Sequence, residues 1–250
     1  MSDDSSESGD RSNDEADGAP AADRPDSPAE TRRNTPGGGV APGANAIVSS
    51  VPEEFGLVQA WWGDGKGKTT AALGMAFRAT GHGYRVHLLQ FLKGGADSVE
   101  DVRGEYNAIE ALSGISYENT GHYGWNRLMD GSDDDEHAAK ATAAFERTRE
   151  LVAAAGEADL SKPLPPEGGP EDGVNMLVLD EILYAVEMDL VDEADVLDLL
   201  ESKPADLELV LTGGHEEPTF LLDAADLVTE VRKVKHPFDE GTRARKGTEY

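Results

Sequence analysis

The chain has 250 residues, no cysteine, and 50 acidic against 22 basic residues, which gives a formal net charge of −28. Without cysteine, neither disulfides nor cysteine-ligated zinc can form, and the negative charge disfavours binding to nucleic acid or to anionic membrane surfaces. The amino terminus lacks the basic start and apolar core of a signal peptide, and no apolar run is long enough to span a bilayer. We therefore expect a cytoplasmic protein that binds neither nucleic acid nor membrane.

The first segment, residues 1–45, is predicted to be a disordered acidic tail. It consists mainly of Ser, Asp, Gly, Pro and Ala, so it cannot bury enough apolar surface to offset the entropy of ordering. Composition favours a solvating tail over an interaction arm. The tail holds 10 acidic and 4 basic residues, so −22 of the net charge falls on a single domain predicted at residues 46–250. Such acidity suits a salt-rich cytosol that screens charge repulsion, and we expect a halophilic origin.

Residues 61–70, Trp-Trp-Gly-Asp-Gly-Lys-Gly-Lys-Thr-Thr, predict a phosphate-binding loop. A buried strand is expected before them at residues 56–61, and a helix after them. Glycines let backbone N–H groups approach phosphate oxygens, and the helix N-terminus adds partial positive charge. In this motif Lys68 contacts phosphates and the Thr69 hydroxyl ligates Mg²⁺. The first glycine of the usual pattern is Trp62 here, and the alternative is a chance glycine-rich turn before a helix.

Strands and helices are predicted to alternate along the rest of the domain. This alternation indicates parallel β-α units with ligands at the carboxyl ends of the strands. We therefore predict an α/β fold of the P-loop NTPase-like (RecA-like) type, a mostly parallel sheet flanked by helices. The expected strands are residues 84–91, 115–118, 174–181, 207–212 and 227–231, and the expected helices are residues 101–112, 133–155, 182–187, 193–202 and 218–225.

Three segments between these elements have more than one interpretation. Residues 120–126 hold large aromatic rings between glycines, which either cover a ligand or pack on the protein's own core. Acids at residues 133–136 could bind a metal, but they also suit the positive end of a helix, which is the commoner arrangement. Residues 156–173, rich in Pro and Gly, are predicted to be a surface loop. The basic stretch from Arg232 onward is either a solvated terminus or a flap over an anionic ligand.

Residues 174–181, Val-Asn-Met-Leu-Val-Leu-Asp-Glu, form a near-continuous apolar strand that ends in two acids. Such a strand places a carboxylate at the carboxyl edge of the sheet, beside Mg²⁺ and the phosphates. After a phosphate-binding loop, Asp180 and Glu181 therefore predict a metal–nucleotide site. If the two acids only capped the next helix, one carboxylate would be explained better than both.

Together these motifs resemble the P-loop ATP:corrinoid adenosyltransferases of the cob(I)yrinic acid a,c-diamide adenosyltransferase family. Several separated motifs in one order are more specific than a phosphate-binding loop alone. The resemblance implies transfer of the 5′-deoxyadenosyl group of ATP to a Co(I) corrinoid, with release of triphosphate, in adenosylcobalamin biosynthesis or salvage. The alternatives are a P-loop ATPase or small-molecule kinase, and a nucleotide-binding regulator or corrinoid carrier. The matching blocks are residues 63–72, 78–83, 90–94, 179–184, 212–213, 225–230, 234–239 and 247–250.

The resemblance also implies roles for individual residues. Lys68, Thr69 and Glu181 are implied to act in catalysis, and Thr69, Glu181 and Asp180 to hold Mg²⁺ or Mn²⁺. An aromatic pair facing the corrin matches Tyr123 and Trp125. An external electron donor such as a flavoprotein is implied to supply Co(I), in a homodimeric enzyme. Gly214 differs from the arginine that the family usually has after Thr-Gly. The implied nucleotide-binding residues are Gly63, Asp64, Gly65, Lys66, Gly67, Lys68, Thr69, Thr70 and Arg78.

Overall fold

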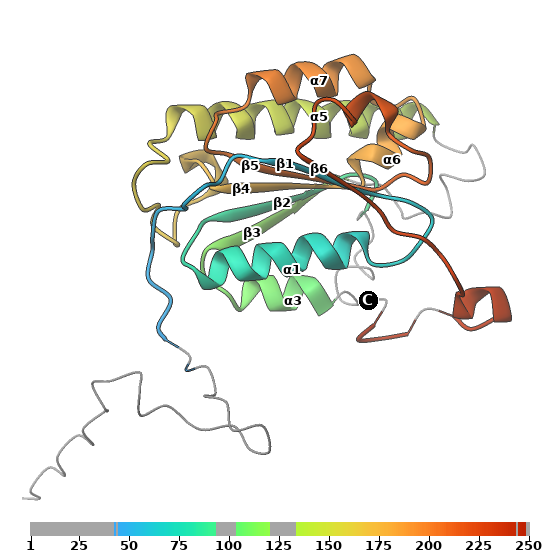
Figure 1. Ribbon diagram of the computed structural model, residues 1–250, viewed down its shortest axis with the longest axis horizontal. Helices are drawn as coiled ribbons and strands as arrows, with labels where there is room; N and C mark the ends of the chain where they lie inside the picture. The colour runs from blue at the N-terminus through green and yellow to red at the C-terminus, as the bar shows by residue number, and fades with distance from the viewer. Residues whose placement is uncertain (1–42, 44, 94–103, 121–133, 244, 249–250) are drawn as a thin grey trace, which may run out of the picture. The chain divides into compact units, whose positions relative to one another are not determined.

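The computed structural model describes residues 43, 45–93, 104–120, 134–243 and 245–248 (Figure 1). The predicted acidic tail, apart from positions 43 and 45, and the predicted aromatic loop after residue 120 lie outside the described residues. The described strands form one six-stranded, fully parallel sheet in the order β3-β2-β4-β5-β1-β6, which confirms the predicted α/β class. Its strands are β1 (Val58–Trp62), β2 (Val86–Gln90), β3 (Ile115–Asn119), β4 (Met176–Asp180), β5 (Glu208–Thr212) and β6 (Leu227–Glu230).

Helices cover both faces of the sheet, as Figure 1 shows. One face carries α1 (Lys68–Gly81) and α3 (Gly104–Glu110), and the other carries α5 (Asp134–Glu157), α6 (Ile182–Glu187) and α7 (Glu193–Ser202). Because successive strand side chains point to opposite faces, β4 contributes to both cores. Met176 and Val178 pack in the cluster on the α1 side, whereas Leu177 and Leu179 pack in the cluster on the α5 side. A strand buried on both faces needs the continuous apolar run seen in its sequence.

The helix predicted at residues 218–225 is wrong, because the structure has only the 3₁₀ turn η3 (Thr219–Leu221) there. Two anchors leave too little chain for a helix. Leu221 is fully buried in the core, while Asp226 bonds both its backbone N–H and its carboxylate to Val58 on β1. The other 3₁₀ turns in the described residues are η2 (Pro170–Asp172) and η4 (Pro237–Glu240).

The connection after α5, predicted to be a surface loop, is tied to the body of the domain by one arginine. Arg85 is 3% exposed and precedes β2. Its Nε donates to the carbonyl of Pro165 at 3.0 Å, and its Nη1 donates to Gly169 at 3.3 Å, Asp172 at 3.2 Å and Gly173 at 2.9 Å. The guanidinium therefore ties four carbonyls of this connection to the start of β2.

Arg85→Leu is expected to lower the free energy of unfolding by about 2–4 kcal/mol, because carbonyls that accept from a buried charged donor lose it. Denaturant unfolding at fixed salt measures the effect. Arg149→Leu is the matched control, since Arg149 is 43% exposed and makes surface ion pairs with Glu146 and Asp195, for which about 0–1 kcal/mol is expected. Equal losses in the two variants would contradict the anchoring role of Arg85.

Candidate functional site

The glycine-rich loop joins β1 to α1 at the carboxyl edge of the sheet and packs against two other chain segments. The backbone N–H of Gly63 donates to the carbonyl of Gly214 at 3.1 Å, and that of Gly65 donates to Val231 at 2.7 Å. Gly63 has φ +115°, and a Cβ there would lie 2.5 Å from the Val231 oxygen, so no other residue fits. The chain that follows β6 therefore fixes the shape of the loop.

Asp64 and Lys68 also bond to the loop and its brace. The Asp64 carboxylate accepts from the backbone N–H of Lys233 at 2.7 Å, and this bond is the main reason why the Asp64 pKa lies below its usual value. Lys68 Nζ folds back and donates to the carbonyls of Gly63 and Gly65. Burial lowers the pKa of Lys68, an effect that the charge of Glu181 opposes. The Lys68 ammonium thus caps loop carbonyls in the described structure.

Asp180, at the end of β4, is the centre of a buried network. Its side chain is fully buried, and each carboxylate oxygen accepts two hydrogen bonds. Oδ1 accepts from Thr69 at 2.9 Å and from Thr212 at 2.6 Å. Oδ2 accepts from Gln90 Nε2 at 2.9 Å and from Lys93 Nζ at 2.6 Å. Four donors from α1, β2, β5 and the turn after β2 therefore saturate this carboxylate.

Glu181 has an unusual backbone conformation beside this network. Its φ of 66° and ψ of 14° lie in the left-handed region, which costs a non-glycine residue about 1–2 kcal/mol. Its N–H donates to the Thr212 hydroxyl at 3.1 Å. A Cβ on Gly213 would lie 2.9 Å from the Glu181 Cα, so the glycine permits the close approach of β5 to this turn. Strained residues of this kind cluster at functional sites.

The three side chains predicted to hold Mg²⁺ converge on the ammonium of Lys93. Nζ lies 2.6 Å from Asp180 Oδ2, 3.1 Å from Glu181 Oε1 and 2.9 Å from Thr69 Oγ1. Burial disfavours the charge of Lys93, but the two carboxylates outweigh it and raise the Lys93 pKa. Oxygen donors of this type fit a hard cation such as Mg²⁺, and here they surround a cation that belongs to the chain.

Gln90, Lys93 and Thr212 fall within blocks that match the family, but the sequence alone predicted no role for them. Gln90 and Thr212 each end a buried strand, and Lys93 follows the same strand as Gln90. Since strand ends meet at one edge of a parallel sheet, polar residues at these positions were the available signal. Their side chains bond to the acids of the second motif and so belong to the same polar network.

Other predicted site residues lie apart from this network or outside it. Lys66, Gly67 and Thr70 are exposed on the loop and at the start of α1. Arg78 is exposed in the last turn of α1, ten residues and about 15 Å along the axis from Lys68, so the helix does not bring it to the loop. The aromatic pair at positions 123 and 125 lies outside the described residues. Within the described ranges, no cluster of three His, Cys, Asp or Glu side chains could hold a metal ion.

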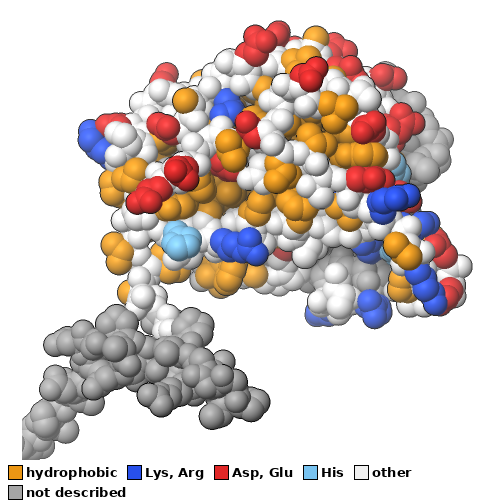
Figure 2. All heavy atoms as spheres, viewed as in Figure 1, with side chains coloured by type: hydrophobic (Ala, Val, Ile, Leu, Met, Phe, Trp, Pro, Cys, Tyr) orange, Lys and Arg blue, Asp and Glu red, His pale blue; other side chains and the backbone are white. Residues whose placement is uncertain are grey.

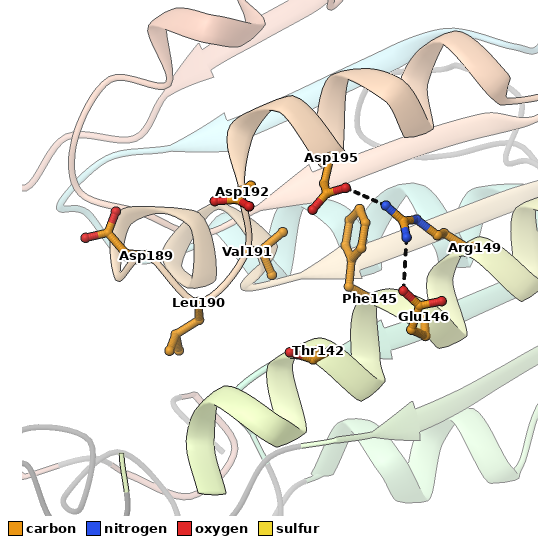
Figure 3. Close-up of a pocket in the computed structure, with 9 residues that line it drawn as sticks. All are labelled: Thr142, Phe145, Glu146, Arg149, Asp189, Leu190, Val191, Asp192 and Asp195. Carbon is orange, nitrogen blue, oxygen red and sulfur yellow. Dashed lines mark hydrogen bonds and ion pairs between the residues drawn. The ribbon is translucent and has the colours of Figure 1, made fainter. Parts of the chain in front are cut away.

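A separate hollow of about 180 Å³ lies between α5 and the chain that joins α6 to α7 (Figure 3). Arg149 bridges Asp195 at 2.5 Å and Glu146 at 3.0 Å across its rim. No residue of the glycine-rich loop lines it, and α5 covers the face of the sheet opposite α1. This hollow is therefore separate from the glycine-rich loop and from the Asp180 network.

Acidic side chains are spread over the visible surface, whereas Lys and Arg gather at the right of the view, where the C-terminal segment lies (Figure 2). The described basic residues of this segment are exposed, and three of them pair with nearby acids. Arg232 pairs with Glu230 at 3.3 Å, Lys233 with Asp239 at 3.3 Å, and Lys235 with Glu240 at 2.8 Å.

Comparison with known proteins shows which family this sequence resembles. The profile of the family described as ATP:corrinoid adenosyltransferase BtuR/CobO/CobP matches residues 54–250. The chain is 33% identical to the corrinoid adenosyltransferase CobA of Salmonella typhimurium over 82% of this chain and 91% of that protein. It is 31% identical to a corrinoid adenosyltransferase of Escherichia coli over the same shares. A corrinoid adenosyltransferase of a Sinorhizobium species is 33% identical over 82% of this chain and 85% of that protein.

Proposed function

Because the chain belongs to the ATP:corrinoid adenosyltransferase BtuR/CobO/CobP family, we propose that its glycine-rich loop binds the triphosphate of ATP as a leaving group. The reaction is transfer of the 5′-deoxyadenosyl group of ATP to a corrinoid. The Co(I) centre of the corrinoid substrate donates an electron pair to C5′ of the ribose, a Co–C bond forms, and the C5′–O bond breaks. The electron pair of that bond leaves with the triphosphate. The observation that carries the proposal is the family match over residues 54–250, together with the network that joins Thr69 to Asp180.

The site residues act by binding and positioning, since Co(I) is itself the nucleophile and no general base is needed. Lys68 turns from the loop carbonyls to the triphosphate and stabilises its developing charge. Backbone N–H groups in the first turn of α1 have no partner within the helix and face the phosphates. Thr69, Asp180 and Glu181 would hold Mg²⁺ or Mn²⁺, which supplies further positive charge to the triphosphate when bound. These interactions lower the barrier by charge stabilisation and orientation.

One anaerobic assay tests the reaction. The protein is incubated with ATP, Mg²⁺ and chemically reduced corrinoid, and the absorbance change on Co–C bond formation is followed. The expected products are a light-sensitive organocobalt compound and intact triphosphate. Release of ADP or phosphate without that compound would instead indicate an ATPase or kinase, and ATP binding without turnover would indicate a carrier or regulator.

We propose that Trp125 covers the corrin and keeps water and the lower axial ligand away from cobalt, which makes Co(II) easier to reduce. Trp125→Ala is expected to leave ATP affinity unchanged and to lower turnover of Co(II) corrinoid by about tenfold or more, which corresponds to about 1.4 kcal/mol. Trp125→Phe retains an apolar ring and is the control. An unchanged rate of Trp125→Ala with Co(II) substrate would remove the corrin-facing role, and Tyr123→Ala tests the second ring in the same assay.

We also propose that the domain of residues 46–250 works as a cytoplasmic homodimer that receives electrons from an external donor such as a flavoprotein. None of the helices in the described part of the chain has the length and apolarity that a bilayer crossing requires.

The charge of −28 and the spread of acids in Figure 2 support a halophilic origin. Stability is therefore expected to fall as KCl is lowered from molar concentration to about 0.1 M, because screening weakens. Thermal unfolding at several salt concentrations tests this, and a flat response would contradict it.

A further inference from the structure

Lys93 occupies a position that the proposed chemistry gives to a metal ion. Its Nζ has three hydrogen-bond donors, and one oxygen each of Thr69, Asp180 and Glu181 lies within 3.1 Å of it. We infer that Lys93 is a tethered cation that holds the metal position in the nucleotide-free enzyme, so that a divalent ion enters only when ATP draws the ammonium away. This rests on the proposed metal role of those three residues.

The charges of the site balance without a metal ion. Asp180 and Glu181 carry two negative charges, and Lys68 and Lys93 carry two positive charges close enough to act on them. A buried carboxylate without a partner is costly, so the two lysines stabilise the empty site. A divalent ion placed among the same oxygens would meet the Lys93 ammonium at contact distance and be repelled. The nucleotide-free protein should therefore bind divalent ions weakly at this position.

The backbone that leads into Lys93 is anchored, so the proposed displacement is one of the Lys93 side chain. The N–H of Phe91 donates to the carbonyl of Asp180 at 2.8 Å, and Phe91 is fully buried. Leu92, 5% exposed, has a φ of 57°, which is rare for a bulky residue. This turn brings the Lys93 side chain to Asp180. Lys93 keeps a small exposed fraction of 9%, so the residue is not completely enclosed.

ATP binding changes this balance. A triphosphate beside Thr69 and Lys68 adds several negative charges next to the ammonium, which can move to a phosphate oxygen and leave the two carboxylates to the metal. Metal binding and ATP binding then support each other, as coupling between neighbouring sites requires. Lys93 becomes a positioning residue that makes the metal depend on the nucleotide.

Binding of Mn²⁺, followed by its electron paramagnetic resonance signal without corrinoid, tests the inference. The wild-type protein should bind Mn²⁺ at this site only when ATP is present. Lys93→Met should bind Mn²⁺ without ATP at least about tenfold more tightly than wild type, because two carboxylates lose their fixed cation. Glu181→Gln in the Lys93→Met background should abolish the gain, which separates this site from the acidic surface. Lys93→Arg keeps the charge and should keep Mn²⁺ out.

Thermal unfolding gives a second readout. Lys93→Met should be less stable than wild type and should regain stability with Mn²⁺ alone. Lys203→Met is the matched control, because Lys203 Nζ is also partly buried and donates to the carbonyls of Gly56, Pro204 and Leu207. That variant should lose stability without rescue by Mn²⁺.

Two results would overturn the inference. One is wild-type protein that binds Mn²⁺ without ATP as tightly as Lys93→Met does, and the other is Lys93→Met that gains no Mn²⁺ binding. If Lys93→Met does not fold, Lys93→Gln, which removes the charge but keeps a hydrogen-bond donor for Asp180, takes its place in the titration without ATP. None of these measurements requires adenosyl transfer, so failure of the proposed reaction would be seen separately in the Co–C bond assay.

Discussion

Lys68→Ala is expected to lower the rate of adenosyl transfer by about 10²–10³-fold, the loss seen when one donor that stabilises developing charge is removed from an active site. The ammonium bonds to two loop carbonyls in the described structure. In the proposed function the loop binds the triphosphate, so the ammonium would lie where charge develops as the C5′–O bond breaks. Since that charge is greater in the transition state than in bound ATP, the loss should fall more on turnover than on ATP affinity.

Single-turnover rates with pre-reduced corrinoid, together with ATP titration by calorimetry, separate the two effects. Lys140→Ala is the control, because Lys140 is exposed on α5, on the face of the sheet opposite α1. Unfolding curves show whether the loop variant keeps its fold. A Lys68→Ala enzyme with the wild-type transfer rate would mean that the loop does not hold the leaving group.

The sequence predicted the class of fold because the information needed is local. Apolar runs such as residues 174–181 mark buried strands, and their alternation with helices requires parallel connections. The order of the strands is not local. β5 lies between β1 and β4, so Thr212 is placed between the glycine-rich loop and the two acids. Only the pairing of strands distant in sequence reveals that Thr212 donates to Asp180.

The difference between local and long-range information also explains which site residues the sequence predicted. Lys68, Thr69 and Asp180 lie in motifs whose geometry the backbone dictates, and the structure brings Thr69 and Asp180 into contact. The position of the Lys93 ammonium depends on the turn at Leu92, whose positive φ no residue preference predicts. The predicted helix at residues 218–225 failed for a related reason, because tertiary anchors overrode its local pattern.

Asp180→Asn is expected to lower the free energy of unfolding by about 3–5 kcal/mol, the cost of breaking a buried ion pair by removing one partner. The substitution keeps the shape of the side chain but changes its hydrogen bonding. Each oxygen of Asp180 accepts from two donors. An amide has only one oxygen, so its NH₂ group must face either the two hydroxyls or the donors of Gln90 and Lys93. In the second arrangement the NH₂ group, itself a donor, would face the donors of Gln90 and Lys93 with no acceptor between them.

Denaturant unfolding measures this loss, with Asp195→Asn as a matched control on an exposed ion pair that should cost about 0–1 kcal/mol. The double variant Asp180→Asn with Lys93→Met distinguishes the cause. If the unpaired Lys93 ammonium accounts for the loss, removing it should recover part of the stability, so the two single losses should not add. Strict additivity would instead assign the loss to Thr69, Thr212 and Gln90. In that case the neutral donors would account for the stabilisation of the carboxylate, and the Lys93–Asp180 pair would add nothing to the free energy of unfolding.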